Sequence, residues 1–412
     1  MQDRKSNTNN MQNRIVIIGS GQAGAMAAIY LRKKKFVGTI RIFGEEKYLP
    51  YQRPPLSKGF LSNETDESKL FLKSEAFYKN NNIELNLKTK VLKIDKENKC
   101  VLSNSNKKIP YDKLIIATGS SVNFLNSEKQ NILYLKTIED SKIIKNELLT
   151  EKTLAIIGGG YIGLELASIA IQKKLKIIIL ESEKRLMSRV VSERISDFYE
   201  NKHRSMGVNI RFNSYVKDIV TNGAKKNISC NDGSEFQADL VFAGIGIKPN
   251  TQIAEEAGLE CNNGIIVNNF GQTSDGSIYA CGDCTNHPNK ILNTRLRLES
   301  VHNAVEQSKS VASMILGNPE PYNQVPWFWS DQYNLKLQIA GIFGEYDHCL
   351  VTGSKEKESF SLSFFTDNQL RCVEAVNRPK DFVLGRKIIA SGKQFDAKLF
   401  ETEISDLRDL IT

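Results

Sequence analysis

Two glycine-rich segments constrain the fold of this 412-residue chain more than any other feature. In each segment an apolar run leads into three glycines, a helical stretch follows, and a second apolar run ends at an acidic residue. The first segment spans residues 14–46 and the second spans residues 153–181. Strand, glycine loop, helix, strand and acid in this order form the dinucleotide-binding fingerprint. Because the complete pattern occurs twice, we predict two nucleotide sites.

The first fingerprint assigns a separate task to each of its small residues. Gly19 makes the tight turn after the strand, Gly21 lets the backbone approach a pyrophosphate, and Gly24 lets the helix pack closely on the strand. The following helix, to about Lys34, would offer unpaired N–H groups to the phosphates. Glu45, which follows the second strand, is placed to bind a ribose hydroxyl pair.

The second fingerprint repeats these tasks with Gly158, Gly160 and Gly163, and Glu181 ends its second strand. A carboxylate at this position repels a 2′-phosphate, so Glu181 favours NADH over NADPH. Lys184 and Arg185 follow closely, which leaves some use of NADPH open.

Three further apolar runs suggest how the chain passes between two such units. They end in small residues or an aspartate, at Ala117-Thr118-Gly119, at Gly246 and at Gly282-Asp283. Residues 323–412 alternate polar and apolar positions around turns such as Asp367-Asn368, and the segment DFVLGRKIIAS predicts a closing helix. The predicted fold is therefore α/β, with two doubly wound Rossmann-like nucleotide-binding domains and an α+β, sheet-rich C-terminal domain.

The stretch YQRPPLSKGF, residues 51–60, stands out between the two fingerprints. Adjacent prolines forbid both a helix and a central strand, so a rigid turn is predicted here. This turn would present Arg53, Ser57 and Lys58.

Composition excludes several classes of function. No run of about 18 apolar residues occurs, so no membrane helix is expected. Residues 1–13 are polar and asparagine-rich and are predicted to form a disordered tail. The net charge of +9 favours acidic partners, but the basic residues form no nucleic-acid motif, and no nucleic-acid partner is expected.

Seven cysteines at mostly wide spacing do not resemble a disulfide framework and indicate a reducing, cytoplasmic location. Cys281 and Cys284 are close together, and we expect two packed thiols there rather than a redox-active disulfide.

The motif order resembles that of the FAD-dependent ferredoxin–NAD reductases of the putidaredoxin reductase type, within the glutathione-reductase-like flavoproteins. The resemblance covers about residues 14–390 and rests on YQRPPLSK, ATG, GGGYIGLELA, GIGIKPN, ACGDC, RLESVHNAVEQ, PWFWSDQY and VNRP. It implies an FAD domain at 14–117 and 248–322, an NAD domain at 118–247 and a C-terminal domain at 323–412.

The resemblance also implies individual contacts. Besides the fingerprint glycines, FAD contacts fall on Ala23, Glu45, Arg53, Lys58, Val91, Ala117, Thr118, Gly119, Lys136, Asp283 and Val301. NADH contacts fall on Gly158, Gly160, Ile162, Gly163, Glu165, Glu181 and Gly246. The catalytic residues would be Lys58 and Glu165, paired at the nicotinamide, and Trp329 near the flavin. The alternatives are a solvated glutamate on a helix face and a tryptophan that packs in the core.

In this family NADH reduces FAD, which passes single electrons to an acidic [2Fe–2S] ferredoxin serving a P450 or a dioxygenase. The chain carries no iron–sulfur ligand set and no cysteine pair at the flavin positions of disulfide reductases, so the cluster would belong to the partner. The protein itself would be a monomer or a weak homodimer. Two alternatives share both fingerprints: an NADH oxidase, and an NADH-responsive flavoprotein similar to apoptosis-inducing factor.

Overall fold

The computed structural model of the chain describes residues 13–125, 131–149, 151–396 and 406–410. The tail predicted for residues 1–13 lies outside these residues apart from Asn13.

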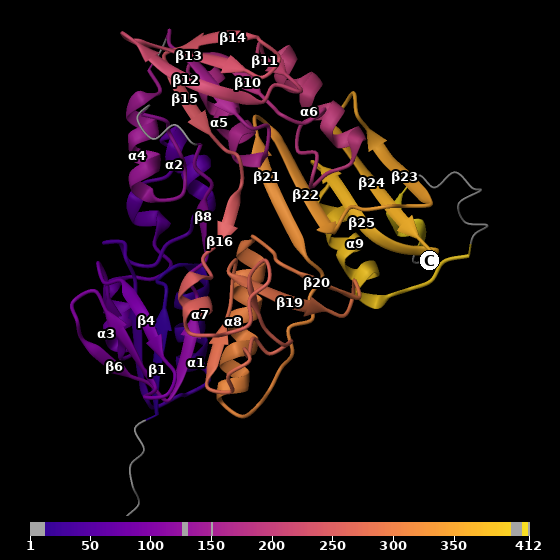
Figure 1. Cartoon of the computed structure of the whole chain (residues 1–412). Helices are drawn as coiled ribbons and strands as arrows, with labels where there is room; N and C mark the ends of the chain where they lie inside the picture. The colour runs from indigo at the N-terminus through magenta and orange to yellow at the C-terminus, as the bar shows by residue number, and fades with distance from the viewer. Residues whose placement is uncertain (1–12, 126–130, 150, 397–405, 411–412) are drawn as a thin grey trace, which may run out of the picture.

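The first fingerprint lies in a parallel sheet with the strand order β18-β7-β1-β2-β3. Its strands are β1 (Arg14–Ile18), β2 (Thr39–Phe43), β3 (Ile83–Asn86), β7 (Lys113–Ile116) and β18 (Ile278–Ala280). Helices α1 (Gln22–Lys33) and α8 (Val301–Ile315) lie side by side (Figure 1). Strands β1, β7 and β18 contain continuous apolar runs because both faces of a doubly wound parallel sheet are covered.

The second fingerprint lies in another parallel sheet, with the order β11-β10-β9-β15. Its strands are β9 (Thr153–Ile157), β10 (Lys176–Leu180), β11 (Asn209–Arg211) and β15 (Leu240–Ala243), and its helices are α5 (Tyr161–Gln172) and α6 (Glu193–Ser205). Each parallel sheet is accompanied by a small antiparallel one. These are β4 (Val91–Asp95), β5 (Cys100–Ser103) and β6 (Lys108–Pro110), and β12 (Val216–Asn222), β13 (Lys225–Cys230) and β14 (Glu235–Ala238).

Two antiparallel segments carry the chain from one fingerprint sheet to the other and back. They are β8 (Ser120–Val122) and β16 (Ile247–Pro249). Side chains fasten them, since Thr118 Oγ1 donates to the carbonyl of Asn250 at 2.7 Å and Asn250 Nδ2 donates to the carbonyl of Thr118 at 2.9 Å. The small residues predicted at the crossings therefore lie where two backbones run side by side.

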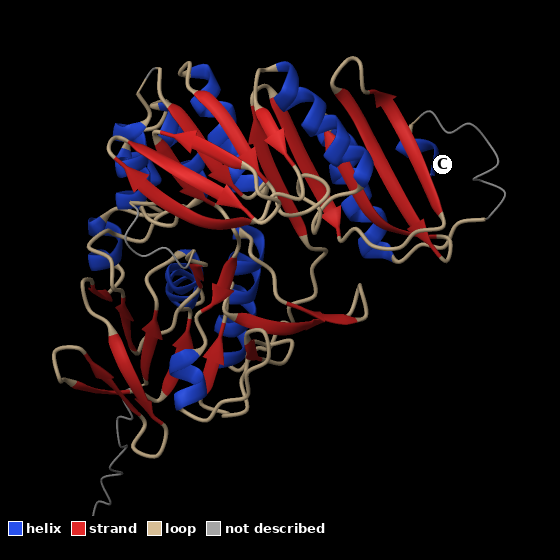
Figure 2. Ribbon diagram, turned by 45° about the horizontal axis from the view of Figure 1, so that its top comes forward, coloured by secondary structure: helices blue, strands red, loops and turns tan. Residues whose placement is uncertain are grey.

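The C-terminal part is an antiparallel sheet with the order β21-β22-β25-β24-β23, followed by α9 (Pro379–Ser391). Its strands are β21 (Trp327–Gln332), β22 (Leu335–Gly341), β23 (His348–Ser354), β24 (Ser359–Thr366) and β25 (Gln369–Val376). The predicted turn joins β24 to β25, with φ of 49° at Asp367 and 58° at Asn368. Figure 2 shows this sheet beside the second fingerprint sheet and above the first. The mixed α/β architecture predicted from the sequence is confirmed.

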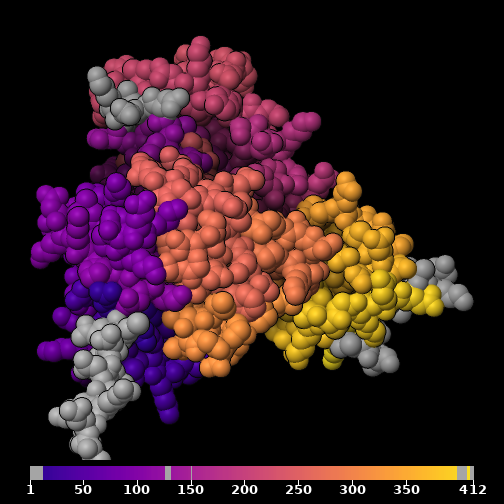
Figure 3. Space-filling view, turned by 60° about the horizontal axis from the view of Figure 1, so that its bottom comes forward, coloured from indigo at the N-terminus to yellow at the C-terminus, as the bar shows by residue number. Residues whose placement is uncertain are grey.

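Short elements complete the described chain. They are α2 (Gly59–Ser62), α3 (Glu75–Asn80), α4 (Ile138–Glu147), α7 (Gln252–Glu256), β17 (Ile265–Ile266), β19 (Thr285–Asn289) and β20 (Thr294–Leu296), with 3-10 turns at Pro54–Ser57, Glu67–Leu70 and Leu407–Leu410. Figure 3 shows the orange residues around α8 between the N-terminal and C-terminal parts of the molecule. Across the described ranges, no helix is long and apolar enough to cross a membrane.

Burial of histidines gives the protein a predicted weakness toward acid. Burial lowers the pKa values of His203, His287 and His302 to about 4. A histidine with a lowered folded-state pKa takes its proton first in the unfolded chain, so stability is lost as the pH falls from 6.5 toward 4. Glu374 acts in the opposite sense, because burial raises its pKa to about 7. Its protonation stabilises the folded state as the pH falls through 7.

We therefore expect the free energy of unfolding to be about 3 kcal/mol lower at pH 5 than at pH 7. The three histidines each lower it by about 2 kcal/mol over this range, and the protonation of Glu374 offsets part of that loss. Urea midpoints at the two pH values measure this difference. His287, whose ring nitrogens have no hydrogen-bond partner among the described residues, offers the control: His287→Phe should reduce the difference by about 2 kcal/mol. Equal midpoints in the unmodified protein would contradict the prediction.

Candidate functional site

The first fingerprint forms a cradle in which two glycines are enclosed and one is open. A Cβ on Gly19, whose φ is +113°, would lie 2.1 Å from the carbonyl oxygen of Ala117, and a Cβ on Gly24 would lie 2.0 Å from that of Gly19. A Cβ on Gly21 would meet no described atom within 4 Å. The absence of a side chain at Gly19 and Gly24 thus lets the strand and the helix pack closely, and Gly21 leaves room beside the N-terminus of α1. This arrangement fits the pyrophosphate of a dinucleotide.

The second fingerprint has the same three-part geometry. A Cβ on Gly158 would lie 2.5 Å from the carbonyl oxygen of Gly244, one on Gly163 would lie 2.5 Å from that of Gly158, and one on Gly160 would meet no described atom within 4 Å. Within the described chain, neither α1 nor α5 has a side-chain N-cap or an acidic residue in its first turn. Their first N–H groups therefore point at space that a phosphate can fill.

The acid of the second fingerprint is fixed by its own backbone. Glu181 is 8 % exposed; its Oε2 accepts the N–H of Gly159 at 2.5 Å and its Oε1 accepts that of Glu183 at 2.8 Å. The guanidinium of Arg185 is bound elsewhere, to the carbonyls of Val191 at 2.9 Å and Ser188 at 2.7 Å. A negative charge is thus held at the fingerprint without a neutralising guanidinium.

The rigid turn of residues 51–60 meets the second fingerprint helix. It is a short 3-10 helix, Pro54–Ser57, because prolines are tolerated in the first turn of a helix, and in this respect the predicted exclusion of helix was wrong. Lys58 Nζ donates to Glu165 Oε2 at 2.7 Å, and Ser57 Oγ donates to the same oxygen at 2.5 Å. Glu165 is 1 % exposed, which excludes the solvated alternative.

Three parts of the fold meet at Glu165. Ser330 of β21 donates to its Oε1 at 2.7 Å, so the carboxylate accepts hydrogen bonds from the turn and from the C-terminal sheet. A buried carboxylate is tolerable only when its charge is paired and its lone pairs are satisfied, and these three donors meet both conditions.

Arg53 lies in a compact charged cluster beside the turn. Its guanidinium pairs with Glu46 at 2.7 Å and donates to the Tyr51 hydroxyl at 2.9 Å and to the carbonyl of Lys136. The Tyr51 hydroxyl donates in turn to Glu46 at 2.6 Å. Arg53 is therefore held by Glu46, and its predicted contact with FAD stays a prediction.

A second polar cluster joins Lys136, Ser120 and Asp283. Lys136 Nζ donates to Ser120 Oγ at 2.8 Å, and Ser120 Oγ donates to Asp283 Oδ2 at 2.9 Å. Burial lowers the pKa of Lys136, while the charge of Asp283 acts against that shift. The fold thus brings together two predicted FAD residues, Lys136 and Asp283, from distant parts of the sequence.

Cys281 and Cys284 flank Asp283 as fully buried free thiols. Burial raises the pKa of Cys281 to about 12, so the reactive thiolate is suppressed. These properties agree with the prediction of packed thiols.

The N-terminus of α8 meets the aromatic residues of β21. Val301 is the first residue of this helix, and Ser300 caps it by accepting the N–H of Asn303. The His302 ring lies 5.5 Å from that of Trp327, which lies 5.4 Å from that of Trp329. Alternation along β21 places both tryptophans on the side opposite Ser330. Trp329 is half-buried, and its predicted role at the flavin stays untested.

The remaining predicted residues are placed as follows. Ala23 lies against Gly282, where a Cβ would be 2.9 Å away from the alanine side chain. Glu45 is exposed and pairs with Lys90 at 3.4 Å, whereas Val91 is buried in the core. Ile162 is 40 % exposed at the start of α5. Gly119 and Gly246 have positive φ, at 66° and 95°, and each directly precedes a crossing strand, β8 and β16 respectively.

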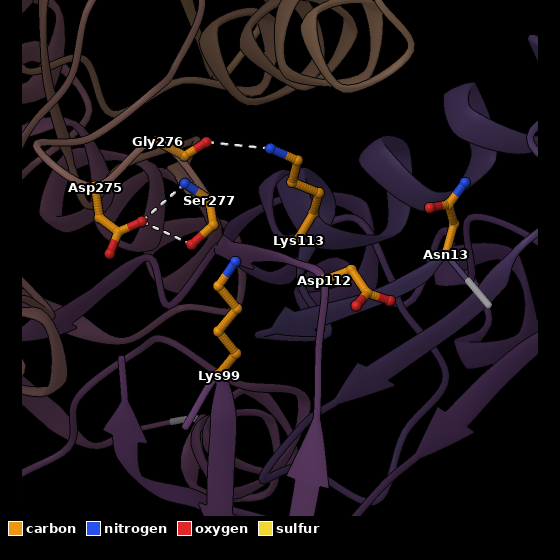
Figure 4. Close-up of a pocket in the computed structure, with 7 residues that line it drawn as sticks. All are labelled: Asn13, Lys99, Asp112, Lys113, Asp275, Gly276 and Ser277. Atoms are coloured by element: carbon orange, nitrogen blue, oxygen red, sulfur yellow. Dashed lines mark hydrogen bonds between the residues drawn. The ribbon is translucent and has the colours of Figure 1, made fainter. Parts of the chain in front are cut away.

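A polar pocket lies at the amino end of β7, in the first sheet. Figure 4 shows Lys99, Asp112, Lys113 and Asp275 among its lining residues. Asp112 forms an ion pair with Arg14 at 2.9 Å, and Lys113 Nζ donates to the carbonyl of Gly276 at 3.2 Å. Asp112 and Lys113 stand at the amino end of β7, whereas ligands of open α/β sheets bind at the carboxyl ends. This pocket is therefore separate from the fingerprint site.

Three residues of the site carried no role in the sequence analysis. Ser57 was recognised in the turn, but its bond to Glu165 was not predicted, and Ser330 and Glu46 were missed. A local signal existed for Glu46, which adjoins Glu45. Ser330 has no local signal, because only the packing of β21 against α5 brings it to the carboxylate.

Comparisons with known proteins agree with this architecture along the chain. The profile of the family described as "Pyridine nucleotide-disulphide oxidoreductase" matches residues 13–308, and that described as "Reductase C-terminal" matches residues 327–411.

Individual relatives extend over nearly the whole chain. Putidaredoxin reductase of Pseudomonas putida is 35% identical over 411 residues, covering 98% of this chain and 97% of that protein. Rubredoxin-NAD(+) reductase of the same organism is 39% identical over 370 residues, covering 89% and 96%. The crystal structure of the covalent putidaredoxin reductase–putidaredoxin complex superposes with a TM-score of 0.93 at 35% identity, covering 98% of this chain and 99% of that one. The chain therefore belongs to the pyridine nucleotide-disulphide oxidoreductase family, among the ferredoxin–NAD reductases of the putidaredoxin reductase type.

Proposed function

We propose that this protein is an FAD-dependent NADH:ferredoxin oxidoreductase. The observation that carries the proposal is the Lys58–Glu165 pair, 2.7 Å long, which joins the turn after the first fingerprint to the helix of the second. Membership of the family entails the use of FAD and NAD(H). When bound, FAD would accept hydride from NADH and release electrons one at a time.

In this proposal the two fingerprints divide the cofactors. Gly19, Gly21 and Gly24 hold FAD, and Gly158, Gly160 and Gly163 hold NADH. The proposed FAD domain comprises residues 14–117 and 248–322, the NAD domain residues 118–247 and the C-terminal domain residues 323–412. The N-termini of α1 and α5 bind the pyrophosphates through backbone N–H groups. The N-terminus of α8, at Val301, is the positive end of the helix dipole and would stabilise negative charge on the reduced flavin when FAD is bound. Lys58 and Glu165 fix the position of the nicotinamide between the two parts. Among the described residues, no other ion pair joins residues 54–58 to α5.

The electron acceptor in our proposal is an acidic [2Fe–2S] ferredoxin that serves a P450 or a dioxygenase. Support comes from the relative solved in complex with putidaredoxin and from the net charge of +9 on this chain. Rubredoxin is the second candidate acceptor, because a rubredoxin-NAD(+) reductase is 39% identical to this chain. We place the reaction in the cytoplasm, where NADH is available and thiols such as the seven free cysteines stay reduced.

Anaerobic stopped-flow mixing tests the function. The FAD-loaded protein is first reduced with NADH and then mixed with an acidic [2Fe–2S] ferredoxin, a rubredoxin or oxygenated buffer. We expect reoxidation by ferredoxin to be the fastest of the three. If rubredoxin reoxidises the protein faster than ferredoxin does, rubredoxin is the electron acceptor instead. If oxygen reoxidises it fastest, the result favours an NADH oxidase. Slow reoxidation in every arm together with a changed elution volume would favour the apoptosis-inducing-factor-like alternative.

The carboxylate of Glu181 leads to a prediction on coenzyme choice. Because Arg185 is bound to backbone carbonyls, a 2′-phosphate would meet negative charge, and kcat/KM for NADH should exceed that for NADPH by about 100-fold, which corresponds to about 2.7 kcal/mol. In Glu181→Ser this ratio should fall to about tenfold or less. Glu183→Gln is the matched control, since its side chain is exposed, and it should keep the ratio. An unchanged ratio in Glu181→Ser would contradict the assignment of this acid.

A further inference from the structure

Glu165 ends a line of hydrogen-bonded side chains that runs from the C-terminal sheet through α6. Ser330 Oγ donates to Glu165 Oε1 at 2.7 Å, and Gln332 Nε2 donates to Ser330 Oγ at 3.1 Å. His203 Nε2 lies 2.8 Å from Gln332 Oε1, and the Tyr333 hydroxyl lies 2.9 Å from His203 Nδ1. Ser330, Gln332 and His203 have no exposed surface. The line thus crosses a buried interface between α5, α6 and the C-terminal sheet.

The charge of Glu165 fixes the direction of every bond in this line. A carboxylate can only accept, so the single hydroxyl proton of Ser330 points to Glu165, and Ser330 must accept from the amide nitrogen of Gln332. The amide oxygen then faces His203 and requires a proton on Nε2. A neutral imidazole has no second proton, so Nδ1 accepts from the Tyr333 hydroxyl. All four donors point toward Glu165.

The properties of His203 agree with this pattern. Burial lowers its pKa to about 4, so near neutral pH the ring carries one proton. The amide of Gln332 does not readily pass a proton onward, which makes the line an orienting device rather than a path for protons. Hydrogen bonds arranged in one direction polarise one another and add to the stabilisation of the terminal charge.

Tyr333 shows that the far end of the line is also specified. Its φ is 57°, a left-handed conformation that a bulky side chain rarely adopts, in the turn between β21 and β22. Its ring contacts His203, with centroids 5.0 Å apart, and lies under Lys202 Nζ at 5.9 Å. The turn thus keeps a tyrosine whose hydroxyl reaches the histidine.

We propose that Ser330, Gln332 and His203 are positioning residues, which hold the Glu165 carboxylate in place against Lys58 and so set the geometry for hydride transfer from NADH. The inference rests on the proposed function, because it deepens the role of the Lys58–Glu165 pair. Its structural part, a line of bonds directed by one charge, can be measured without any turnover.

The first test reads the tautomer of His203 in protein labelled with [15N]histidine, which has four histidines to resolve. The unmodified protein at pH 7 should show the Nε2–H tautomer at His203. In Glu165→Gln, Lys58 can only donate and therefore takes the amide oxygen, so the amide nitrogen faces Ser330. Every bond in the line then reverses, and His203 should become the Nδ1–H tautomer. An Nδ1–H ring in the unmodified protein, or no change in Glu165→Gln, would overturn the proposal.

The second test is kinetic. Gln332→Met and His203→Phe break the line, and each should slow flavin reduction at saturating NADH about tenfold or more, with little change in KM for NADH and full FAD content. His203→Gln keeps a side-chain donor and should restore the rate to within about threefold of the unmodified protein. Ser192→Ala is the matched control: Ser192 caps the same helix, α6, and its hydroxyl donates to Glu374 in the same interface, but it lies outside the line. It should lower stability and leave the reduction rate unchanged.

The outcomes separate this inference from the proposed function. If NADH fails to reduce the unmodified FAD protein, the proposed function is wrong, and the tautomer experiment alone then decides whether the directed line exists. If the unmodified protein is reduced but Gln332→Met and His203→Phe match its rate, the proposed function stands and the positioning role is wrong. An equal loss of rate in Ser192→Ala would also overturn the positioning role, because general loosening of the interface would explain it.

Discussion

Replacing Gly21 by valine is expected to give a folded protein that no longer retains FAD. The expectation follows from the open space at this glycine, where an added Cβ meets no described atom within 4 Å. The protein therefore tolerates the side chain, but the side chain fills the volume that a pyrophosphate needs beside the N-terminus of α1. The flavin absorbance of the purified protein, compared with its far-ultraviolet circular dichroism, measures both parts of the prediction.

Gly160→Val is the matched variant in the second fingerprint, where an added Cβ is equally free. It should keep a full complement of FAD and lose reduction by NADH, with the apparent KM raised about 100-fold or more. The pair tests which fingerprint holds which nucleotide. If Gly21→Val kept FAD and Gly160→Val lost it, the assignment of the two sites would be reversed.

Removing the ammonium of Lys58 should impair both catalysis and stability. In Lys58→Met the buried Glu165 loses its cation, and flavin reduction by NADH should slow about 100-fold because the nicotinamide is no longer held in position. FAD content should stay full. The free energy of unfolding should fall by about 3 kcal/mol, since breaking a buried ion pair leaves an uncompensated charge. Stopped-flow flavin absorbance and urea unfolding measure the two effects.

Two further variants separate the causes. Lys58→Met combined with Glu165→Leu removes both charges and should regain part of the stability without regaining the reduction rate. Lys142→Met breaks a pair with Glu67 that is 2.6 Å long but more than one-third exposed on each side, and it should change the stability by less than about 1 kcal/mol. A normal rate in Lys58→Met would show that the pair has no catalytic weight.

Much of the fold could be predicted because its signals are local. Strand β1, the turn at Gly19 and helix α1 follow each other within residues 14–33, and each is specified by the residue types at that place. The same holds for β9, Gly158 and α5. The start of α8 at Val301 and the turn at Asp367-Asn368 were also predictable, since a capping serine and two residues tolerant of positive φ mark them.

The charged residues of the site were harder to predict, because charge pairing depends on distance in space. Arg53 was expected to contact FAD, but its pairing with Glu46 was not predicted, because the acid expected to act after this strand was the neighbouring Glu45. Both acids follow the same strand, and only the path of the backbone after Gly44 decides which one turns inward.

Local residue types specify the two fingerprints, the cradle glycines and the stiff turn at Pro54-Pro55, because each depends on steric rules that act over a few residues. The meeting of Glu165 with Ser57, Lys58 and Ser330 in one buried place depends on the three-dimensional packing of the chain. The same is true of the hydrogen bonds that continue through Gln332 to His203. The donors come from three separate parts of the chain, and a hydrogen bond requires contact within about 3 Å. Such contact arises from packing between domains, for which a single sequence carries no local signal.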